Sequence, residues 1–501
     1  MSSHAQTRSR VTGAMMGLAV GDALGVPVEF EPRRAREADP VVSLRGGGTW
    51  KAAPGTWSDD TSLSLCLAES IVLKGFDPDD FAGRALSWLD GGLWSADGRA
   101  FDVGGATRRA LVRIRAGMPA VLAGGRGEND NGNGALMRML PASIWLAALP
   151  EPARLRAIAA YSAVTHGHPR SLLAAWLHCL LCARLLDGSP PGEAYARAME
   201  EARSLLPSLP ASLRAEAGAY ARVLDGGLAS APSSSIRGSG YVVHCLEAAF
   251  WCLLRCGNFS SAVLAAVNLG EDADTTGAVA GGLAGLAYGR EALPEEWTSR
   301  IARSAEIEAL AERLAGLVEA PAPLPRSYWV LPGKLLAGGY PGRGRGGSPA
   351  GTEPGDSLPG AALNVLVGAG VDAFLDLTSP GEDLGVPPYA VPPGSAFVRR
   401  GAPLEDMSAD DRAVGRAVAE LESLLAAGKT VYMHCVGGLG RTGTIVGSYL
   451  VGKGLVAPGE AVSLLKALRA GTDKPEADSP QTEEQRRLVE SSLPGPSALS
   501  L

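Results

Sequence analysis

The sequence has little excess positive charge and few cysteines, and both shortages exclude classes of protein. Its 46 lysines and arginines are outnumbered by 53 aspartates and glutamates, which gives a formal net charge of −7. A nucleic acid held by general electrostatic attraction is therefore excluded as a partner. Seven cysteines in a chain of 501 residues do not indicate a disulfide framework, so reduced thiols are expected.

The sequence also lacks a long, uninterrupted apolar run. The polar segment MSSHAQTRSR is not followed by the hydrophobic region of a signal peptide. The most apolar stretch, residues 172–186, contains His178 and Arg184, which is unfavourable inside a bilayer. We therefore expect a cytoplasmic protein without a membrane partner.

The length and the apolar spacing indicate a multidomain chain. Domains average roughly 150 residues, so two to four units are expected. Residues 11–318 repeat apolar side chains at three- and four-residue intervals, which is typical of packed helices. The segment PAPLPRS, residues 321–327, cannot continue a helix. We predict a helical domain at 11–318, a linker at 319–327 and a second domain at 328–493.

The second domain has the pattern of an α/β fold. Two short runs rich in β-formers, residues 371–377 and 430–435, flank a helical pattern at 410–425. Between the linker and these runs, residues 338–360 are rich in glycine and proline without periodicity. We predict a mobile loop there, inside the second domain.

The segment HCVGGLGRTG, residues 434–443, lies between a predicted strand and an apolar helix expected at 444–451. Its glycines allow successive backbone N–H groups to point inward, and the following helix contributes its positive end, so phosphate is the expected occupant. The predicted phosphate-binding residues are Val436, Gly437, Gly438, Leu439, Gly440 and Arg441.

Cys435 is the predicted nucleophile of this loop. The dipoles of the loop and the charge of Arg441 favour the thiolate, which is the form that attacks phosphorus. The planar guanidinium of Arg441 can bind two phosphoryl oxygens at once, and Thr442 is expected to donate a hydrogen bond to the sulfur as it leaves. The alternative is that Cys435 is a buried structural thiol.

Cleavage of a phosphoester also needs an acid, and the segment PLEDMS, residues 403–408, offers Asp406 with Glu405 as its competitor. Together with SYWVLPGKLLAGGYPG before the loop and SPQTEEQRRLV after it, these residues resemble the dual-specificity and tyrosine phosphatase superfamily over about 327–493. The resemblance implies that Asp406 is the general acid, that Gln485 helps to place the hydrolytic water, and that no cofactor is needed. A solvated loop carboxylate is the alternative for Asp406.

Two acidic clusters stand out in the helical part, in the segments WSDDTSL and GEDADTTGA. Carboxylates and hydroxyls are hard oxygen ligands that suit Mg²⁺ or Mn²⁺, and four carboxylates supply enough negative charge for two ions. Each cluster taken alone is equally consistent with a helix N-cap. The candidate ligands are Ser58, Asp59, Asp60, Asp272, Asp274 and Thr275.

Further motifs join these clusters in a fixed order: GAMMGLAVGDALGVPVEF, WSDDTSL, NGNGALMRMLP, THGHP, GYVVHCLEAAFW and GEDADTTGAVAGGLAG. In that order they resemble the ADP-ribosylglycohydrolase family over about 11–318. The resemblance implies an all-α fold, and it implies that the six candidate ligands hold metals that bind the ribose hydroxyls and activate water. It also implies that Glu29 is an additional acid or base.

The sequence departs from that family at two positions. Ser58 stands where threonine is frequent, and it keeps the oxygen ligand. Glu271 stands where glycine is common, and its charge either tightens metal binding or crowds the substrate diphosphate. His166 and His168 lie in a family motif and are either ligand contacts or structural residues.

The sequence as a whole predicts a bifunctional hydrolase. Its expected partners are an ADP-ribosylated protein or small ADP-ribose conjugate, and a phosphoprotein or other phosphoester. The main alternative is a phosphatase that a non-catalytic ADP-ribose-binding domain directs to its targets. A structural role, for which some crystallins that resemble this family give a precedent, would require lost ligands. A phosphoinositide or nucleotide substrate is less favoured, because HCVGGLGR contains no lysine.

Overall fold

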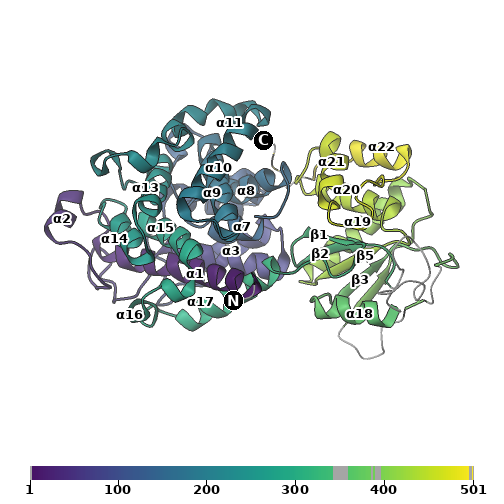
Figure 1. Cartoon of the computed structure of the whole chain (residues 1–501), viewed down its shortest axis with the longest axis horizontal. Coiled ribbons are helices and arrows are strands. Elements are labelled where there is room, and N and C mark those ends of the chain that lie inside the picture. The colour runs from purple at the N-terminus through teal and green to yellow at the C-terminus, as the bar shows by residue number, and fades with distance from the viewer. Residues whose placement is uncertain (1–2, 342–358, 385–387, 390–396, 496–498, 500–501) are drawn as a thin grey trace.

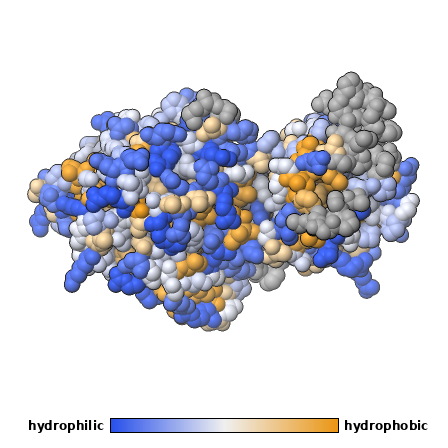
Figure 2. Space-filling model, turned by 90° about the horizontal axis from the view of Figure 1, so that it is seen from below, coloured by the Kyte–Doolittle hydropathy of each residue, from blue (hydrophilic) through white to orange (hydrophobic). Residues whose placement is uncertain are grey.

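A computed structural model describes residues 3–341, 359–384, 388–389, 397–495 and 499. It places an all-helical part on one side and an α/β part on the other (Figure 1), so the predicted fold class is confirmed. Residues 342–358 of the predicted loop at 338–360 lie outside the described residues. Figure 2 shows hydrophilic residues over most of the visible face of the helical part.

The helical part ends with α17 and the α/β part begins with β1 (Ser327–Leu331). Its described α-helices are α1 (Ser3–Gly25), α2 (Arg33–Ala38), α3 (Asp59–Lys74), α4 (Pro78–Gly91), α5 (Gly105–Arg115), α6 (Ala120–Ala123), α7 (Leu140–Trp145), α8 (Ala153–Ala163), α9 (Pro169–Leu186), α10 (Pro191–Leu205), α11 (Ala211–Ala215), α12 (Ala221–Leu224), α13 (Val242–Arg255), α14 (Phe259–Val267), α15 (Ala273–Tyr288), α16 (Glu295–Thr298) and α17 (Ser304–Val318).

Helix α1 lies in the core of the helical part. By length and composition it could cross a membrane, but its apolar window is entirely buried within the fold, as expected of a core helix. Glycines on α1 face glycines on α15, and a Cβ atom added to Gly21 would lie 2.5 Å from the carbonyl carbon of Gly277. The two backbones therefore touch, and this contact brings Asp22 of α1 close to Asp274 of α15.

The α/β part is built on a five-stranded sheet of order β1-β2-β5-β3-β4. Strands β1 and β2 form an antiparallel hairpin, and the remaining neighbours are parallel. The other strands are β2 (Leu335–Gly338), β3 (Ala373–Asp376), β4 (Val398–Gly401) and β5 (Val431–His434). Both strands predicted from β-formers are present as β3 and β5.

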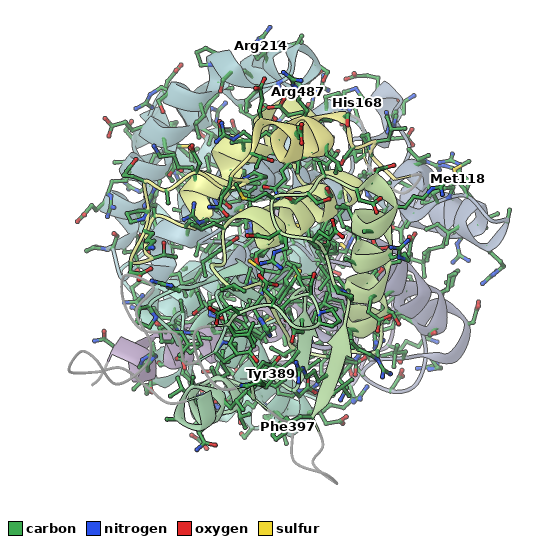
Figure 3. All side chains as sticks on the ribbon, turned by 90° about the vertical axis from the view of Figure 1, so that its right-hand side faces the viewer. Met118, His168, Arg214, Tyr389, Phe397 and Arg487 are labelled. Carbon is green, nitrogen blue, oxygen red and sulfur yellow. The ribbon has the colours of Figure 1, made fainter. Side chains whose placement is uncertain are left out.

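Side chains alternate between the two faces of the sheet, and each face packs against a different cluster of apolar residues. Leu336, Phe374 and Tyr432 pack with Leu366 of α18 (Pro359–Gly368). The opposite face packs against α19 (Asp411–Ala426), α20 (Gly440–Gly452) and α21 (Ala461–Leu468), with α22 (Glu483–Ser491) packed on α20. Figure 3 shows this separation: Tyr389 lies at the lower end of the domain and Arg487 of α22 at the upper end.

Helix α20 begins earlier than predicted. The sequence predicts an apolar helix at 444–451, whereas the helix starts at Gly440. Polar groups outside the helix fix its first turn: the side chain of Gln481 accepts the N–H of Gly440 at 3.1 Å, and Ser479 donates to the carbonyl of Leu439 at 2.8 Å. Arg441 and Thr442 therefore belong to the first turn of this helix.

The tip of the β1–β2 hairpin packs into the helical part. Lys334 is only 3% exposed, and its ammonium donates at 3.1 Å to the carbonyls of Leu73 in α3 and of Gly428 after α19. The indole of Trp145 donates to the carbonyl of Pro332 at 2.9 Å. The two parts are therefore packed against each other through buried polar contacts, in addition to the chain segment that connects them.

Candidate active sites

The helical part contains a cavity of about 690 Å³ where the ends of α3, α5 and α15 meet. Five carboxylates and the hydroxyl of one predicted ligand lie around it, and the carboxylates make the wall acidic. Four of them are predicted site residues, and Asp102 and Glu271 join them. These lining residues are Glu29, Asp59, Asp102, Glu271, Asp272 and Thr275.

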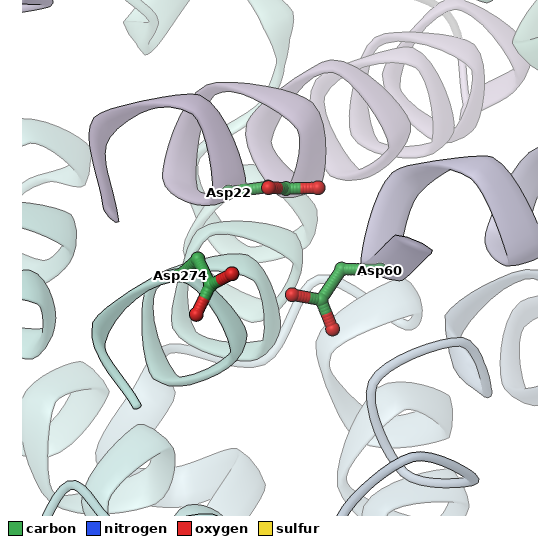
Figure 4. A group of neighbouring side chains, drawn as sticks. All are labelled: Asp22, Asp60 and Asp274. Carbon is green, nitrogen blue, oxygen red and sulfur yellow. The ribbon is translucent and has the colours of Figure 1, made fainter. Parts of the chain in front are cut away.

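Three helices bring their aspartates together next to this cavity. Asp22 of α1, Asp60 of α3 and Asp274 of α15 each offer an oxygen within 4.8 Å of the others, and Figure 4 shows their carboxylates converging. Glu29, Asp272 and Asp274 form a second group by the same distance. Asp274 belongs to both groups, so the two positions are adjacent.

The carboxylates of this cluster fit a divalent cation. One oxygen of Asp60 and both oxygens of Asp274 are buried without a hydrogen-bond partner. Burial and repulsion between the carboxylates raise the pKa of both side chains well above the usual range. A cation bound between such groups would remove both the repulsion and the unmet hydrogen-bonding capacity. Asp22, Asp60 and Asp274 would hold one ion, and Glu29, Asp272 and Asp274 a second.

Asp22 is a site residue that the sequence reasoning missed. Its carboxylate accepts the hydroxyl of Thr61 at 2.6 Å and the N–H of Ser58 at 2.9 Å, so it fixes the start of α3. Burial raises its pKa to about 6. The signal was present, because Asp22 is the only ionisable residue between Val11 and Gly25.

Ser58 is the N-cap of α3, as the alternative interpretation proposed. Its hydroxyl oxygen accepts the N–H of Asp60 at 3.3 Å and lies 3.2 Å from the carboxylate of Asp60. Asp272 occupies the N-cap position of α15 without a side-chain capping bond, and it instead accepts the amide of Asn133 at 2.7 Å. The capping interpretation thus explains Ser58 and leaves the carboxylates for another role.

Glu29 lies at the cavity and is oriented by a neighbouring indole. The indole of Trp50 donates to its carboxylate at 2.6 Å. Burial, followed by repulsion from Asp102, raises the pKa of Glu29 to about 8. Asp102, which the sequence reasoning also missed, has its pKa raised to about 6 by burial and then by Asp272. A carboxyl that keeps its proton near neutral pH can act as a general acid.

The two histidines of the THGHP motif have different surroundings. His166 lines the cavity, its ring nitrogen lies 2.8 Å from the hydroxyl of Thr165, and burial lowers its pKa to about 3. His168 caps α9 by accepting the N–H of Arg170 at 3.1 Å. His166 is therefore the one placed to contact a ligand.

Glu271 has a backbone conformation that glycine would adopt without strain, with φ of +61°. Its N–H donates to Glu31 and its carbonyl accepts the N–H of Phe30, both at 2.7 Å. These two bonds hold the residue at the cavity wall, where its side chain is exposed.

The second candidate site is the loop after β5. The N–H of Gly438 donates to the sulfur of Cys435 at 3.2 Å, and Gly438 has a φ of +75°, which glycine adopts readily. The hydroxyl of Thr442 accepts the N–H of Cys435 at 3.0 Å and donates to the carbonyl of Gly338 at 3.3 Å, and its donation to the departing sulfur stays a prediction. Both bonds help to fix the shape of the loop.

Arg441 is held by a partner that the sequence reasoning missed. Its two terminal nitrogens donate to the two carboxylate oxygens of Glu382, at 2.7 and 2.6 Å, and Arg441 lowers the pKa of Glu382. The Nε of Arg441 is buried without a hydrogen-bond partner, so one N–H remains free for a phosphate oxygen. Nothing in the sequence marks Glu382, because it lies in an irregular segment after β3.

Asp406 reaches this site from the loop before α19. One of its carboxylate oxygens lies 3.2 Å from Arg441, while its side chain stays 60% exposed and open to a substrate. Among the described residues, Glu405 forms no ion pair with Arg441. Gln485 completes the capping box of α22 with Thr482, and it donates to the carbonyl of Ser408 at 3.2 Å, so it supports the Asp406 loop. Its role toward water stays a prediction.

Two family models match this chain in consecutive regions. The ADP-ribosylglycohydrolase family matches residues 3–323, and a family described as "polymorphic toxin system, DSP-PTPase phosphatase" matches residues 352–455.

Known proteins match the helical part. The "ADP-ribosylarginine hydrolase Tri1" of Pseudomonas putida (strain GB-1) is 37% identical over 319 residues, which cover 62% of this chain and 78% of that protein. The "ADP-ribosyl-[dinitrogen reductase] glycohydrolase" of Rhodospirillum rubrum is 33% identical over 303 residues, which cover 60% and 92%. A solved structure, "ADP-ribosylglycohydrolase-related protein complex", is 37% identical with a TM-score of 0.52 and covers 63% of this chain and 99% of its own. The chain therefore belongs to the ADP-ribosylglycohydrolase family, and it carries a DSP-PTPase phosphatase domain after the helical one.

Proposed function

We propose that the helical domain is a metal-dependent hydrolase that releases ADP-ribose from arginine side chains. The unpartnered, buried carboxylate oxygens of Asp60 and Asp274 beside a cavity of about 690 Å³ carry this proposal. Mg²⁺ or Mn²⁺ bound there would supply positive charge to ribose hydroxyls and an activated water. The named activity of the Pseudomonas putida relative supports the arginine linkage.

Glu29 is proposed as the proton donor of this reaction. Its raised pKa, about 8, keeps the carboxyl protonated at neutral pH until a cation or substrate changes its surroundings. The hydrogen bond from Trp50 fixes the orientation of the carboxyl. Glu29 can then deliver its proton to the nitrogen that leaves the anomeric carbon.

The acidic wall supports a cationic leaving group. Glu271 adds an exposed carboxylate to a cavity that Asp102 also lines. Such a wall attracts the positive charge of a guanidinium, and it has no such electrostatic attraction for a neutral serine oxygen. Phe30, which is 61% exposed at the same wall, gives the planar guanidinium an aromatic face.

For the second domain we propose hydrolysis of a phosphomonoester through a phosphocysteine. The sulfur of Cys435 bonds to phosphorus as the ester oxygen leaves with a proton from Asp406. Water then attacks phosphorus, gives a proton back to the Asp406 carboxylate, displaces the sulfur as a thiolate and releases inorganic phosphate. The free Nε of Arg441 and the N–H groups of the loop bind the phosphoryl oxygens throughout. We propose phosphoprotein or another phosphoester as substrate, and the cytoplasm as the location, because Cys435 must remain reduced.

One experiment tests the first activity. Release of ADP-ribose is measured from arginine-linked and serine-linked ADP-ribosylated peptides, with Mg²⁺ or EDTA, for the intact chain and for Asp272→Ala. We expect Mg²⁺-dependent release from the arginine peptide that the substitution abolishes. Tight ADP-ribose binding without release from either peptide would make the domain a non-catalytic reader and refute the proposal.

A second experiment separates the two activities. Hydrolysis of p-nitrophenyl phosphate is measured with EDTA present, for the intact chain and for Cys435→Ser. We expect hydrolysis that does not need a metal and that Cys435→Ser abolishes. The same substitution should leave the release of ADP-ribose unchanged. Phosphatase activity that survives in Cys435→Ser would contradict the phosphocysteine route.

A further inference from the structure

A small cavity lies against the phosphate loop. Its volume is about 10 Å³, and it is lined by Arg326, Tyr328 and Arg469 together with Gly437, Gly438 and Leu439. Neither proposed reaction uses Arg326, Tyr328 or Arg469. The cavity adjoins a groove of about 710 Å³ between residues 322–325 and residues 471–474.

Two hydrogen-bonding groups of this cavity have no partner among the described residues. Tyr328 is 4% exposed, and its hydroxyl is buried and unbonded. Arg326 donates from Nε to Asp473 at 3.0 Å, while its Nη2 is buried and unbonded. Buried donors without partners are uncommon in folded proteins, so this pair requires an occupant.

The side chains around the cavity carry a net positive charge, which bears on the charge of its occupant. Arg469 is 2% exposed, and its guanidinium donates at 2.7 Å to the carbonyls of Ala477 and Lys474, with no described carboxylate in contact. Arg326, Arg469 and Lys474 carry three positive charges against one negative charge on Asp473. This excess of positive charge favours an anion over a neutral water.

We propose that this cavity and the adjoining groove bind a small oxyanion of the phosphate or sulfate class. A volume of about 10 Å³ accommodates one atom of the size of a water oxygen. One oxyanion oxygen therefore accepts from Tyr328 and Arg326, and the remainder of the ion lies in the groove beside Lys474. The site is distinct from the place where the phosphoester would bind, because its lining includes neither Cys435 nor Arg441.

The first test is crystallographic and uses selenate as the probe. Crystals of the full chain soaked in selenate should show two anomalous peaks, one above Cys435 and one beside Tyr328. Tyr328→Phe should lose the second peak alone. Lys466→Gln is the matched control, because Lys466 pairs with Glu476 outside the cavity, and it should keep both peaks.

The second test measures affinity in solution. Carboxymethylation of Cys435 blocks the phosphate loop, and sulfate is then titrated into the full chain by calorimetry. Because each lost hydrogen bond to an anion weakens binding by roughly tenfold, Tyr328→Phe and Lys474→Gln should each raise the dissociation constant by about that factor. A single ordered water beside Tyr328, or sulfate binding that neither substitution changes, would overturn the proposal.

Discussion

The contact between α1 and α15 predicts that Gly21→Ala strongly destabilises the helical domain. The added Cβ would lie 2.5 Å from the carbonyl carbon of Gly277, whereas non-bonded carbons prefer about 3.5–4.0 Å. The obstacle is backbone, so the two helices must separate by about 1 Å. Overpacking typically costs 1–3 kcal/mol, and we expect about 3 kcal/mol here. At about 2 °C per kcal/mol for a domain of this size, Tm should fall by about 6 °C.

The same displacement should weaken the metal site. Asp22 follows Gly21 directly, and Asp274 lies one turn before Gly277, so separation of the helices moves the two carboxylates apart. The assay is thermal unfolding followed by circular dichroism, with and without Mg²⁺. We expect Gly21→Ala to lower Tm and to reduce the rise in Tm that Mg²⁺ causes in the unsubstituted chain.

Gly83→Ala is the matched control for this prediction. Gly83 lies inside α4 with no atom within 4 Å of an added Cβ, so the same change should stabilise the domain by about 0.5–1 kcal/mol. Because both substitutions exchange glycine for alanine, changes in stability of opposite sign would reflect the different packing around positions 21 and 83. A Tm for Gly21→Ala within about 1 °C of the unsubstituted chain would refute the reasoning.

Four further predictions follow from the sites. Mg²⁺ at a hundred times its dissociation constant should stabilise the helical domain by about 2.7 kcal/mol, and Asp274→Asn should abolish this gain. Glu382→Gln should lower kcat for p-nitrophenyl phosphate by about tenfold, because an amide cannot accept from both terminal nitrogens of Arg441. Glu271→Gly should raise Tm by relieving about 1 kcal/mol of backbone strain and should narrow the rate ratio between arginine and serine peptides. Burial lowers the pKa of His178 to about 4, so the free energy of unfolding should fall as pH drops below about 6.5, the value in the unfolded chain. By pH 5 this loss is about 2 kcal/mol. His178→Gln should remove that part of the pH dependence in unfolding experiments.

The sequence predicted the elements whose pattern is local. Helices were visible from apolar spacing, and β3 and β5 from short runs of β-formers, because each pattern lies within one element. The start of α20 was predicted four residues too late, since its first turn depends on Gln481 and Ser479 from a distant segment. The buried hairpin tip at Lys334 was also invisible, because its partners are backbone carbonyls of α3 and of the turn after α19.

The site residues divide in the same way. Cys435 and Arg441 share one short loop, and Asp60 and Asp274 each belong to a local acidic cluster, so sequence could nominate them. Glu382 acts only through its contact with Arg441, across 59 positions of the chain, and no local pattern reveals such a pair. Thr442 belongs to the same loop, but its bond to the carbonyl of Gly338 depends on how β2 ends, which no local pattern reveals.

The junction at Lys334 also bears on how the two proposed activities relate. Helix α3 begins at the acidic cluster and ends at the junction, and its 16 residues span about 24 Å. Strand β5 begins at the junction, where the N–H of Val431 donates to the carbonyl of Lys334 at 2.9 Å, and it leads to Cys435 over about 13 Å. Helix α3 and strand β5 therefore both have one end at Lys334, and each of the two proposed sites lies at the opposite end of one of these elements. The two proposed sites share none of their described residues, so each site should keep its full rate when Asp272→Ala or Cys435→Ser inactivates the other.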